Sequence, residues 1–219
     1  MTDRFGGALG WAVASLKERG IYRTTKVALA VLADLDFDLR YSTDTLGRVA
    51  KEALGGGSSG YSATKARAFR ELIGKLDLPR GVGFVDLGCG KGRVLMLAAL
   101  EGFERVVGVE YSSFLCAIAR SNVKIFVRKA RVSALIDVIE TDVVKFRFEP
   151  EQSIFFLYNP FGEEACERML ANLEFSLAAC PRRVWLIYNA PVHEEPFTRR
   201  FGRGQAFEIG GSLFKVYHV

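Results

Sequence analysis

Apolar residues in the first third of the chain recur at intervals of three and four positions, which is typical of amphipathic helices. Three segments with this spacing predict helices, at residues 11–19, 25–35 and 63–76. Between the last two, the run GGGSSG from Gly55 to Gly60 is typical of a flexible linker. We therefore expect residues 1–60 to form a helical extension with a linker and residues 61–219 to form the main domain.

After Gly81 the pattern changes to short β-branched and aromatic runs that alternate with amphipathic stretches. The short runs predict strands at residues 82–87, 105–110, 135–140, 154–158 and 184–188. The stretches between them predict helices at residues 93–100, 114–128 and 163–179. Such alternation favours a doubly wound, mostly parallel α/β sheet with helices on both faces. Residues 205–209 and 213–219 flank a Gly-Gly-Ser turn, so the sheet is expected to end in an antiparallel hairpin.

The composition is that of a globular protein, since 49% of the 219 residues are hydrophobic and 25% are charged. No apolar run approaches the roughly 18–20 residues of a membrane span, and no signal peptide pattern is found. A cytoplasmic enzyme is therefore expected. The four cysteines lack C-x-x-C spacing and only two histidines occur, which argues against a structural zinc site or a disulfide framework. The net charge of +5 permits an acidic partner without requiring one.

Candidate chemistry begins where the strand at residues 82–87 ends. Gly88, Gly90 and Gly92 stand at alternate positions there, and a helix is expected from Arg93. Glycine permits positive φ and lets a ligand approach the backbone at the carboxyl edge of a sheet. The spacing is G-x-G-x-G, whereas dinucleotide-binding folds use G-x-G-x-x-G, which argues against an NAD-dependent oxidoreductase.

Three acidic residues stand at the tips of successive strands at this same edge. Asp86 precedes Gly88 by two positions, where its carboxylate can meet a cationic ligand group or fix the loop. Glu110 closes the next strand, and both of its oxygens can accept hydrogen bonds from a ribose diol. Asp142 follows the third strand. Three carboxylates beside one glycine loop predict a nucleoside-binding site.

The segment VDLGCGKG at residues 85–92 resembles the first motif of the class I S-adenosylmethionine-dependent methyltransferases. The resemblance covers about residues 61–219 and implies a seven-stranded, Rossmann-like sheet. It also implies S-adenosyl-L-methionine as cofactor, S-adenosyl-L-homocysteine as product, and a glycine loop that passes the methionine part of the cofactor. No metal is expected. The residues that are then expected to bind the cofactor are Tyr61, Thr64, Asp86, Gly88, Cys89, Gly90, Gly92, Glu110, Tyr111, Asp142, Val143 and Asn159.

The resemblance implies separate roles for the acidic residues of this set. Asp86 would lie near the amino end of the cofactor, Glu110 on the ribose hydroxyls, and Asp142 on the adenine amino group. Tyr111 and Val143 would lie beside the adenine ring. Cys89, inside the loop, is interpreted as a small packed residue, since no histidine is placed to activate it as a nucleophile.

The segment Tyr61-Ser62-Ala63-Thr64 resembles the aromatic-x-x-Thr element that folds over the cofactor in some protein-lysine methyltransferases without the SET fold. One hypothesis is that the preceding Gly/Ser linker lets Tyr61 and Thr64 close over the cofactor as a lid. The alternative is a helix cap after a linker, with Thr64 or Ser62 as the capping residue.

The acceptor side is predicted at Asn159-Pro160-Phe161, where the apolar strand at residues 154–158 ends. This tripeptide resembles a shortened D/N-P-P-Y/F motif of amino-methylating enzymes, without the second proline. There the polar side chain and the next carbonyl accept hydrogen bonds from the target nitrogen, and the aromatic ring packs on the acceptor. The alternative is a simple turn after a buried strand. His193 is a candidate general base, although a surface position is favoured for it.

These features predict a methyltransferase that transfers the methyl group of S-adenosylmethionine to a protein lysine or another nitrogen. A small-molecule acceptor is the next candidate, and a nucleic acid stays open. The basic runs at residues 120–131 and 199–203 are interpreted as solvated helix faces rather than as a nucleic-acid surface. Alternatives of another class are an NAD-dependent oxidoreductase and a non-catalytic cofactor-binding module that acts as an interaction partner.

Overall fold

Seven strands form one sheet in the computed structural model, which describes residues 35–47, 49, 60–159 and 161–219. The helix predicted at residues 11–19, the one predicted at 25–35 except its last residue, and linker residues 55–59 lie outside the described residues. The strands are β1 (Gly83–Leu87), β2 (Arg105–Glu110), β3 (Leu135–Glu140), β4 (Gln152–Tyr158), β5 (Trp185–Asn189), β6 (Gln205–Ile209) and β7 (Ser212–His218). The helices are α2 (Ala66–Lys75), α3 (Arg93–Leu100), α4 (Ser113–Ala130), α5 (Glu163–Ala179) and α6 (Glu195–Phe201), with a 3-10 turn η2 (Val143–Lys145).

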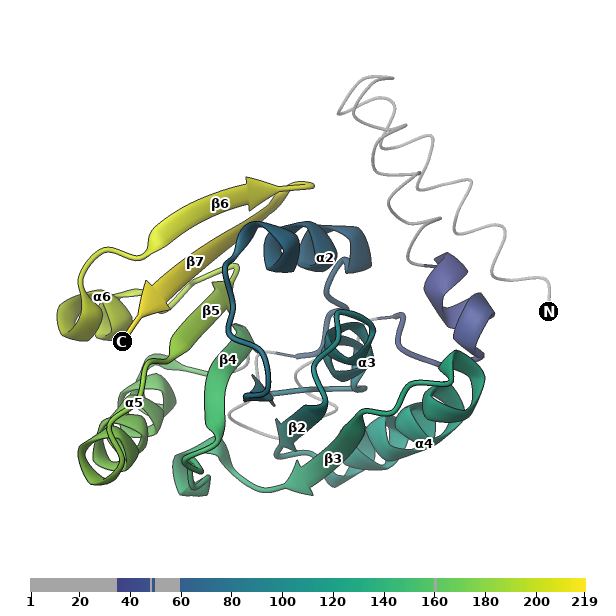
Figure 1. Cartoon of the computed structure of the whole chain (residues 1–219), viewed down its shortest axis with the longest axis horizontal. Coiled ribbons are helices and arrows are strands. Elements are labelled where there is room, and N and C mark those ends of the chain that lie inside the picture. The colour runs from purple at the N-terminus through teal and green to yellow at the C-terminus, as the bar shows by residue number, and fades with distance from the viewer. Residues whose placement is uncertain (1–34, 48, 50–59, 160) are drawn as a thin grey trace.

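The strand order in the sheet is β3-β2-β1-β4-β5-β7-β6. The first five of these strands pair in parallel, whereas β7 runs antiparallel to both β5 and β6. Figure 1 shows α2, α3 and α4 on one face of the sheet and α5 and α6 on the other. The predicted doubly wound, mostly parallel sheet with a terminal hairpin is therefore confirmed.

Apolar cores on both faces of the sheet explain why its central strands are almost continuously hydrophobic. Phe84 of β1 and Phe156 of β4 belong to the core beneath α2, α3 and α4. Val85 and Phe155, the neighbouring residues, belong to the core beneath α5 and α6. Successive side chains of a strand point to opposite faces, so a strand covered on both faces must be apolar throughout. Asp86 is thus an exception in a strand whose every residue is buried.

The start of α2 differs from the prediction. The helix begins at Ala66, and its N-cap residue, Lys65, makes no capping hydrogen bond with its side chain. The expectation that Thr64 or Ser62 caps this helix is therefore wrong. The reason is a longer extended segment: the backbone is still extended at Lys65, and the Thr64 carbonyl accepts a hydrogen bond from Arg93 Nε instead (2.9 Å).

Most of the basic run at residues 199–203 lies in α6, a helix that the sequence pattern did not predict. α6 begins with a proline in its first turn, which is compatible with a helix start. Arg199 pairs with Glu195 (2.9 Å), and Arg200 pairs with Glu167 and Glu174 (2.6 and 3.3 Å). Acidic neighbours therefore compensate this run locally, in agreement with its interpretation as a helix face. Within the described residues, every helix is too short or too polar to span a lipid bilayer.

The last part of the N-terminal extension packs against α4. Residues 35–41 are helical and lie beside α4 in Figure 1, where they are coloured purple. The Phe37 and Tyr41 rings contact the Phe126 ring, with centroid distances of 6.3 and 4.9 Å. Residues 43–46 then run without regular secondary structure toward the glycine loop.

Candidate active site

A cavity of about 350 Å³ lies at the carboxyl ends of β1, β2 and β4. In this sheet the chain order reverses between β1 and β4, the place where ligands bind in open α/β sheets. Most of the predicted site residues line the cavity, namely Tyr61, Thr64, Asp86, Gly88, Cys89, Gly90, Glu110, Tyr111, Asp142, Val143 and Phe161. Of the predicted residues that the structure describes, Gly92 and Asn159 lie outside this lining. Pro160 is not among the described residues.

The glycine loop adopts the left-handed backbone that its spacing predicts. Gly88, Gly90 and Gly92 have φ values of +83°, +54° and +82°. A Cβ atom on Gly90 would lie 2.3 Å from Cδ2 of Tyr61, so the tyrosine ring rests directly on the loop backbone. A Cβ atom on Gly92 would lie 3.3 Å from Cβ of Ala119 in α4. Gly90 therefore shapes the cavity, whereas Gly92 allows close packing of the loop on α4.

Gly90→Ala is expected to displace the Tyr61 ring and to weaken binding of S-adenosylhomocysteine about ten-fold or more. Alanine at this position adds both a strained backbone, of about 1–2 kcal/mol, and a side-chain clash with the ring. Gly81→Ala is the matched control, because Gly81 has φ +75° and no atom within 4 Å of an added Cβ. Isothermal titration calorimetry should show weaker binding in the first variant only, while both lose stability.

Glu110 is held in one orientation by the backbone around it. Its Oε2 accepts a hydrogen bond from the Gly90 amide and its Oε1 accepts one from the Ser112 amide, each at 2.9 Å. A carboxylate has about four lone-pair sites, so both oxygens retain acceptor capacity toward the cavity that they line. This geometry fits a ligand with two adjacent hydroxyl groups.

The Asp86 carboxyl group is buried in the cavity wall, with 3% of the residue exposed. Among the described residues, none forms a hydrogen bond or an ion pair with this carboxyl group. Burial, and secondarily the negative charge of Glu110, raise the pKa of Asp86 well above its ordinary value. Such a group is satisfied by a proton or by a cationic ligand. The site therefore fits the positively charged part of S-adenosylmethionine.

The third wall of the cavity comes from the segment after β3. The Asp142 side chain accepts a hydrogen bond from the Val144 amide (3.1 Å) and so caps η2. Val143 is buried, whereas 63% of Tyr111 is exposed. An apolar side chain beside a carboxylate and an aromatic ring fits a planar heterocycle with an exocyclic amino group.

The tip of β4 is fixed by β5. Asn159 has a φ of +40°, and its Oδ1 accepts a hydrogen bond from the Tyr188 hydroxyl (3.2 Å). Tyr188 is fully buried, and its hydroxyl accepts a hydrogen bond from the His193 amide (3.3 Å). Phe161 lines the cavity beyond this tip. The Asn159 side chain is thus held in place by a residue 29 positions away.

The structure bears on Cys89 as a nucleophile and on His193 as a general base. Burial and the charge of Asp86 raise the pKa of the Cys89 thiol well above its usual value, which keeps the thiol protonated. A Cβ atom on Gly108 would lie 2.7 Å from this sulfur, so Cys89 is tightly packed. The His193 side chain is not among the cavity-lining groups of the described chain. No group of three or more metal-ligating side chains occurs in the described residues either.

Several residues of the lining were missed by sequence reasoning. They include Ser112, Thr141, Val144, Tyr158, Glu164, Arg168 and Arg93. Ser112 carries a recognisable signal, since it is the N-cap of α4 and follows Glu110 by two positions. Glu164 and Arg168 lie one turn apart in α5, directly after Phe161, but this spacing is common on solvent-exposed helices.

The comparison with protein families identifies the family of the protein. The model of the family described as histone methylation protein DOT1 matches residues 53–166, slightly more than half of the chain. The chain belongs to the DOT1 family. The matched region contains the glycine loop, all three acidic residues and the Asn159 strand tip.

Solved structures share the fold of this DOT1-family protein. An RNA methyltransferase from Salinibacter ruber, in complex with S-adenosyl-L-homocysteine, is 19% identical with a TM-score of 0.55, over 73% of this chain and 94% of that one. A methyltransferase from Aquifex aeolicus is 17% identical with a TM-score of 0.51, over 68% and 87% of the two chains. A predicted N6-adenine-specific DNA methylase from Listeria monocytogenes is 17% identical with a TM-score of 0.51, over 71% and 51%. Comparison with curated proteins gave no match.

The protein is therefore an S-adenosylmethionine-dependent methyltransferase of class I with a Rossmann-like fold. Its cofactor is S-adenosyl-L-methionine, as predicted. This outcome replaces the alternatives of an NAD-dependent oxidoreductase and a non-catalytic module. The DOT1 family also agrees with the resemblance of the Tyr61–Thr64 segment to protein-lysine methyltransferases. Residues 55–59 of the linker on which a lid would move lie outside the described residues.

Proposed function

We propose that this DOT1-family enzyme methylates a nitrogen of a protein side chain, with lysine as the favoured acceptor. The observation that carries the proposal is the tip of β4, where the buried Tyr188 holds the Asn159 amide two residues before Phe161, which lines the cavity. An amide oxygen in a fixed position can accept a hydrogen bond from an amine and orient its lone pair. The family, described as histone methylation protein DOT1, supports a protein acceptor.

The cofactor side of the proposal follows the walls of the cavity. Glu110 would accept hydrogen bonds from the ribose hydroxyls, Asp142 would accept one from the adenine amino group, and Asp86 would face the amino end. Val143 and Tyr111 would contact the two faces of the adenine ring. Two observations support these roles: backbone amides fix the orientation of the Glu110 carboxylate, and the buried Asp86 carboxyl group has no partner among the residues that the structure describes. Tyr61, Thr64, Gly88, Cys89 and Gly90 would enclose the methionine part.

When bound, S-adenosylmethionine supplies a methyl group that its sulfonium already makes electrophilic. The residues of this chain then need to align the acceptor nitrogen and to exclude water. Tyr158 and Phe161 provide aromatic groups in a cavity lining that also contains Glu164 and Arg168, whose charges are opposite. Aromatic faces attract an alkylammonium group, which favours a lysine side chain over an anionic acceptor. The amine must lose a proton before transfer.

The acceptor class is tested by transfer of tritium from labelled S-adenosylmethionine into a cell lysate that is fractionated into protein, nucleic acid and small molecules. We expect the label in protein, and acid hydrolysis should release it as methyllysine. Label in RNA, DNA or small molecules would overturn the protein acceptor while leaving the methyltransferase assignment intact. The division into an extension at residues 1–60 and a domain at residues 61–219 stays a proposal.

Tyr188→Phe is expected to lower kcat for methyl transfer about ten-fold, with little change in affinity for S-adenosylhomocysteine. The substitution removes the hydroxyl that donates to Asn159 Oδ1 and accepts from the His193 amide, and the lost hydrogen bond to Asn159, of about 1 kcal/mol, weakens the hold on the acceptor-orienting group. Tyr217→Phe is the matched control: Tyr217 is equally buried, but its hydroxyl donates to Glu194 (3.1 Å). Equal rates for both variants would refute the role of Asn159 in orienting the acceptor.

A further inference from the structure

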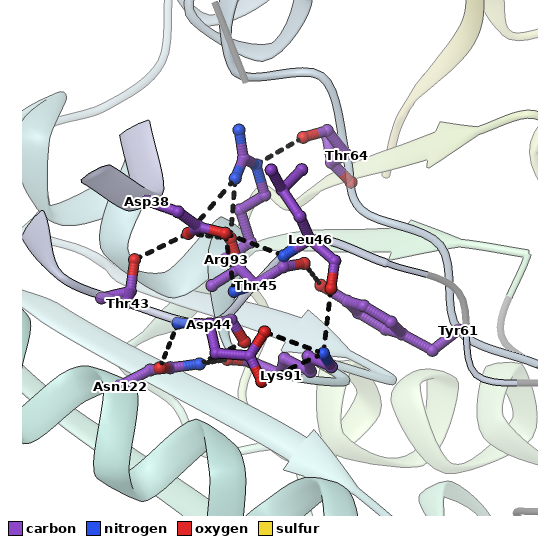
Figure 2. Close-up of polar contacts among 10 residues, drawn as sticks. All are labelled: Asp38, Thr43, Asp44, Thr45, Leu46, Tyr61, Thr64, Lys91, Arg93 and Asn122. Carbon is purple, nitrogen blue, oxygen red and sulfur yellow. Dashed lines mark hydrogen bonds and ion pairs between the residues drawn. The ribbon is translucent and has the colours of Figure 1, made fainter. Parts of the chain in front are cut away.

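Two basic side chains, one in the glycine loop and one at the start of α3, bind residues that precede the core. Lys91 Nζ donates a hydrogen bond to the Leu46 carbonyl (2.9 Å) and pairs with Asp44 (3.3 Å). Arg93 Nη1 donates to Thr45 Oγ1 (2.7 Å). Both side chains are buried, and Arg93 is only 1% exposed. Figure 2 shows these contacts, in which the loop that borders the cavity is tied to residues 38–46.

A buried guanidinium group is costly unless its surroundings compensate its charge and its donors. The Asp38 carboxylate lies 3.7 Å from Arg93 Nη1, and the Phe37 ring lies 4.7 Å from the guanidinium carbon. Arg93 Nε also donates to the Thr64 carbonyl, in the segment that lines the cavity. Directional bonds of this kind specify one geometry of the loop relative to Thr64 and Thr45, which an apolar side chain of the same volume would not do.

Thr45 is the centre of this network. Its hydroxyl donates to Asp38 Oδ1 (2.6 Å) while accepting from Arg93, and its carbonyl accepts a hydrogen bond from the Tyr61 hydroxyl (2.6 Å). Asp38 in turn accepts hydrogen bonds from the amides of Thr45 and Leu46, each at 2.9 Å. Thr45 is completely buried. It therefore connects the N-terminal segment both to the loop and to the ring that covers the loop.

From Tyr61 the contacts continue into the cavity. The Tyr61 ring rests on Gly90, and the Gly90 amide donates to Glu110. A second connection runs through Asn122 of α4, whose side chain accepts from the Asp44 amide (2.8 Å) and donates to the Lys91 carbonyl (3.0 Å). Residues outside the cavity are thus linked to Glu110 by an unbroken series of hydrogen bonds and close contacts.

We propose that Thr45 is a positioning residue for cofactor binding, which acts on Glu110 through Tyr61 and Gly90 without touching the cofactor. Through Thr45, the segment that precedes the core helps to set the affinity of the enzyme for S-adenosylmethionine. The inference rests on the proposed place of the ribose at Glu110. It does not depend on the identity of the methyl acceptor.

The test compares the affinity of full-length variants for S-adenosylhomocysteine by isothermal titration calorimetry. Thr45→Val keeps the shape but removes the hydroxyl, and we expect about ten-fold weaker binding, within the range of coupling through packed networks. Thr45→Ser restores the hydroxyl and should restore the affinity. Thr43→Val is the matched control, because the Thr43 hydroxyl also donates to Asp38 Oδ1 (2.7 Å) but has no contact with Arg93 or Tyr61 in Figure 2.

Unchanged affinity in Thr45→Val, or an equal loss in Thr43→Val, overturns the proposal, even if both variants are less stable. Should Thr45→Val fail to fold, Tyr61→Phe takes its place, since it removes only the hydroxyl bound to the Thr45 carbonyl and should weaken binding in the same way. Glu110→Ala, measured in parallel, separates the place of the ribose from the positioning role of Thr45. If Glu110→Ala binds S-adenosylhomocysteine as tightly as the parent, the placement of the ribose at Glu110 is wrong. If Glu110→Ala binds weakly and Thr45→Val binds like the parent, only the positioning role of Thr45 is wrong.

A second readout uses the reciprocity of coupling. If residues 38–46 favour cofactor binding, then bound S-adenosylhomocysteine must favour their native geometry by the same factor. Hydrogen exchange of the Thr45 and Leu46 amides, which donate to Asp38, should therefore slow about ten-fold in the complex. Exchange at the same rate with and without S-adenosylhomocysteine would contradict the coupling between Thr45 and the cofactor site, because a purely structural role of Thr45 predicts that exchange does not change on binding.

Discussion

Glu110→Ala is expected to weaken binding of S-adenosylmethionine and S-adenosylhomocysteine at least about 100-fold. Hydrogen bonds to a charged acceptor contribute roughly 1.5–3 kcal/mol each, so the loss of the two proposed contacts with the ribose corresponds to a factor of about 100 or more. The substitution also removes the acceptor of the Gly90 and Ser112 amides, which releases the glycine loop. Isothermal titration calorimetry measures the loss, and the thermal stabilisation by either ligand should disappear.

Glu140→Ala is the control for this variant. Glu140 is the register partner of Glu110 on the neighbouring strand, yet it pairs with Arg120 at the surface, where both side chains are nearly half exposed. We expect its affinity to equal that of the parent. A Glu110→Ala protein that still binds as tightly as the parent would show that the nucleoside lies elsewhere.

Asp86→Asn is expected to stabilise the ligand-free protein at neutral pH and to weaken cofactor binding about 10- to 100-fold. The pKa of Asp86 is raised in the folded state, so the folded protein holds a proton that the unfolded chain releases above an ordinary pKa of 3.8. The contribution of Asp86 to the free energy of unfolding of the parent is therefore fully present below that pH and is lost as the pH rises through the raised pKa. Asparagine does not ionise, so the variant does not lose stability in this way. Asparagine also lacks the negative charge that would attract the cationic ligand.

Thermal unfolding of ligand-free protein between pH 4 and pH 8 checks the stability part of this prediction. The melting temperature of the parent should fall with rising pH relative to the variant, by about 2–4 °C for each kcal/mol. Calorimetry in two buffers of different ionisation enthalpy checks the binding part, since ligand binding should release a proton from the parent only. Asp137→Asn, on the exposed strand β3, is the control. A parallel pH dependence in parent and Asp86→Asn would contradict the assignment.

The sequence by itself determined the layers of the fold and the location of the cavity. Alternating strand and helix patterns are local properties, because burial of a strand on two faces or of a helix on one face dictates the residues within it. A parallel sheet brings its strand ends to one edge, so Asp86, Glu110 and Asp142 were expected to meet there. The glycine spacing predicted the left-handed loop for the same local reason.

Only the tertiary structure decided which polar groups are partners. Arg93 and Thr45 are 48 positions apart, and Asn159 and Tyr188 are 29 apart, with no pattern in the sequence that relates them. The structure likewise shows that Asp86 has no partner among the described residues, whereas Glu110 has two. A hydrogen bond needs groups within about 3 Å and well aligned. That condition depends on how separate elements pack, and the residues that make up each element do not specify it.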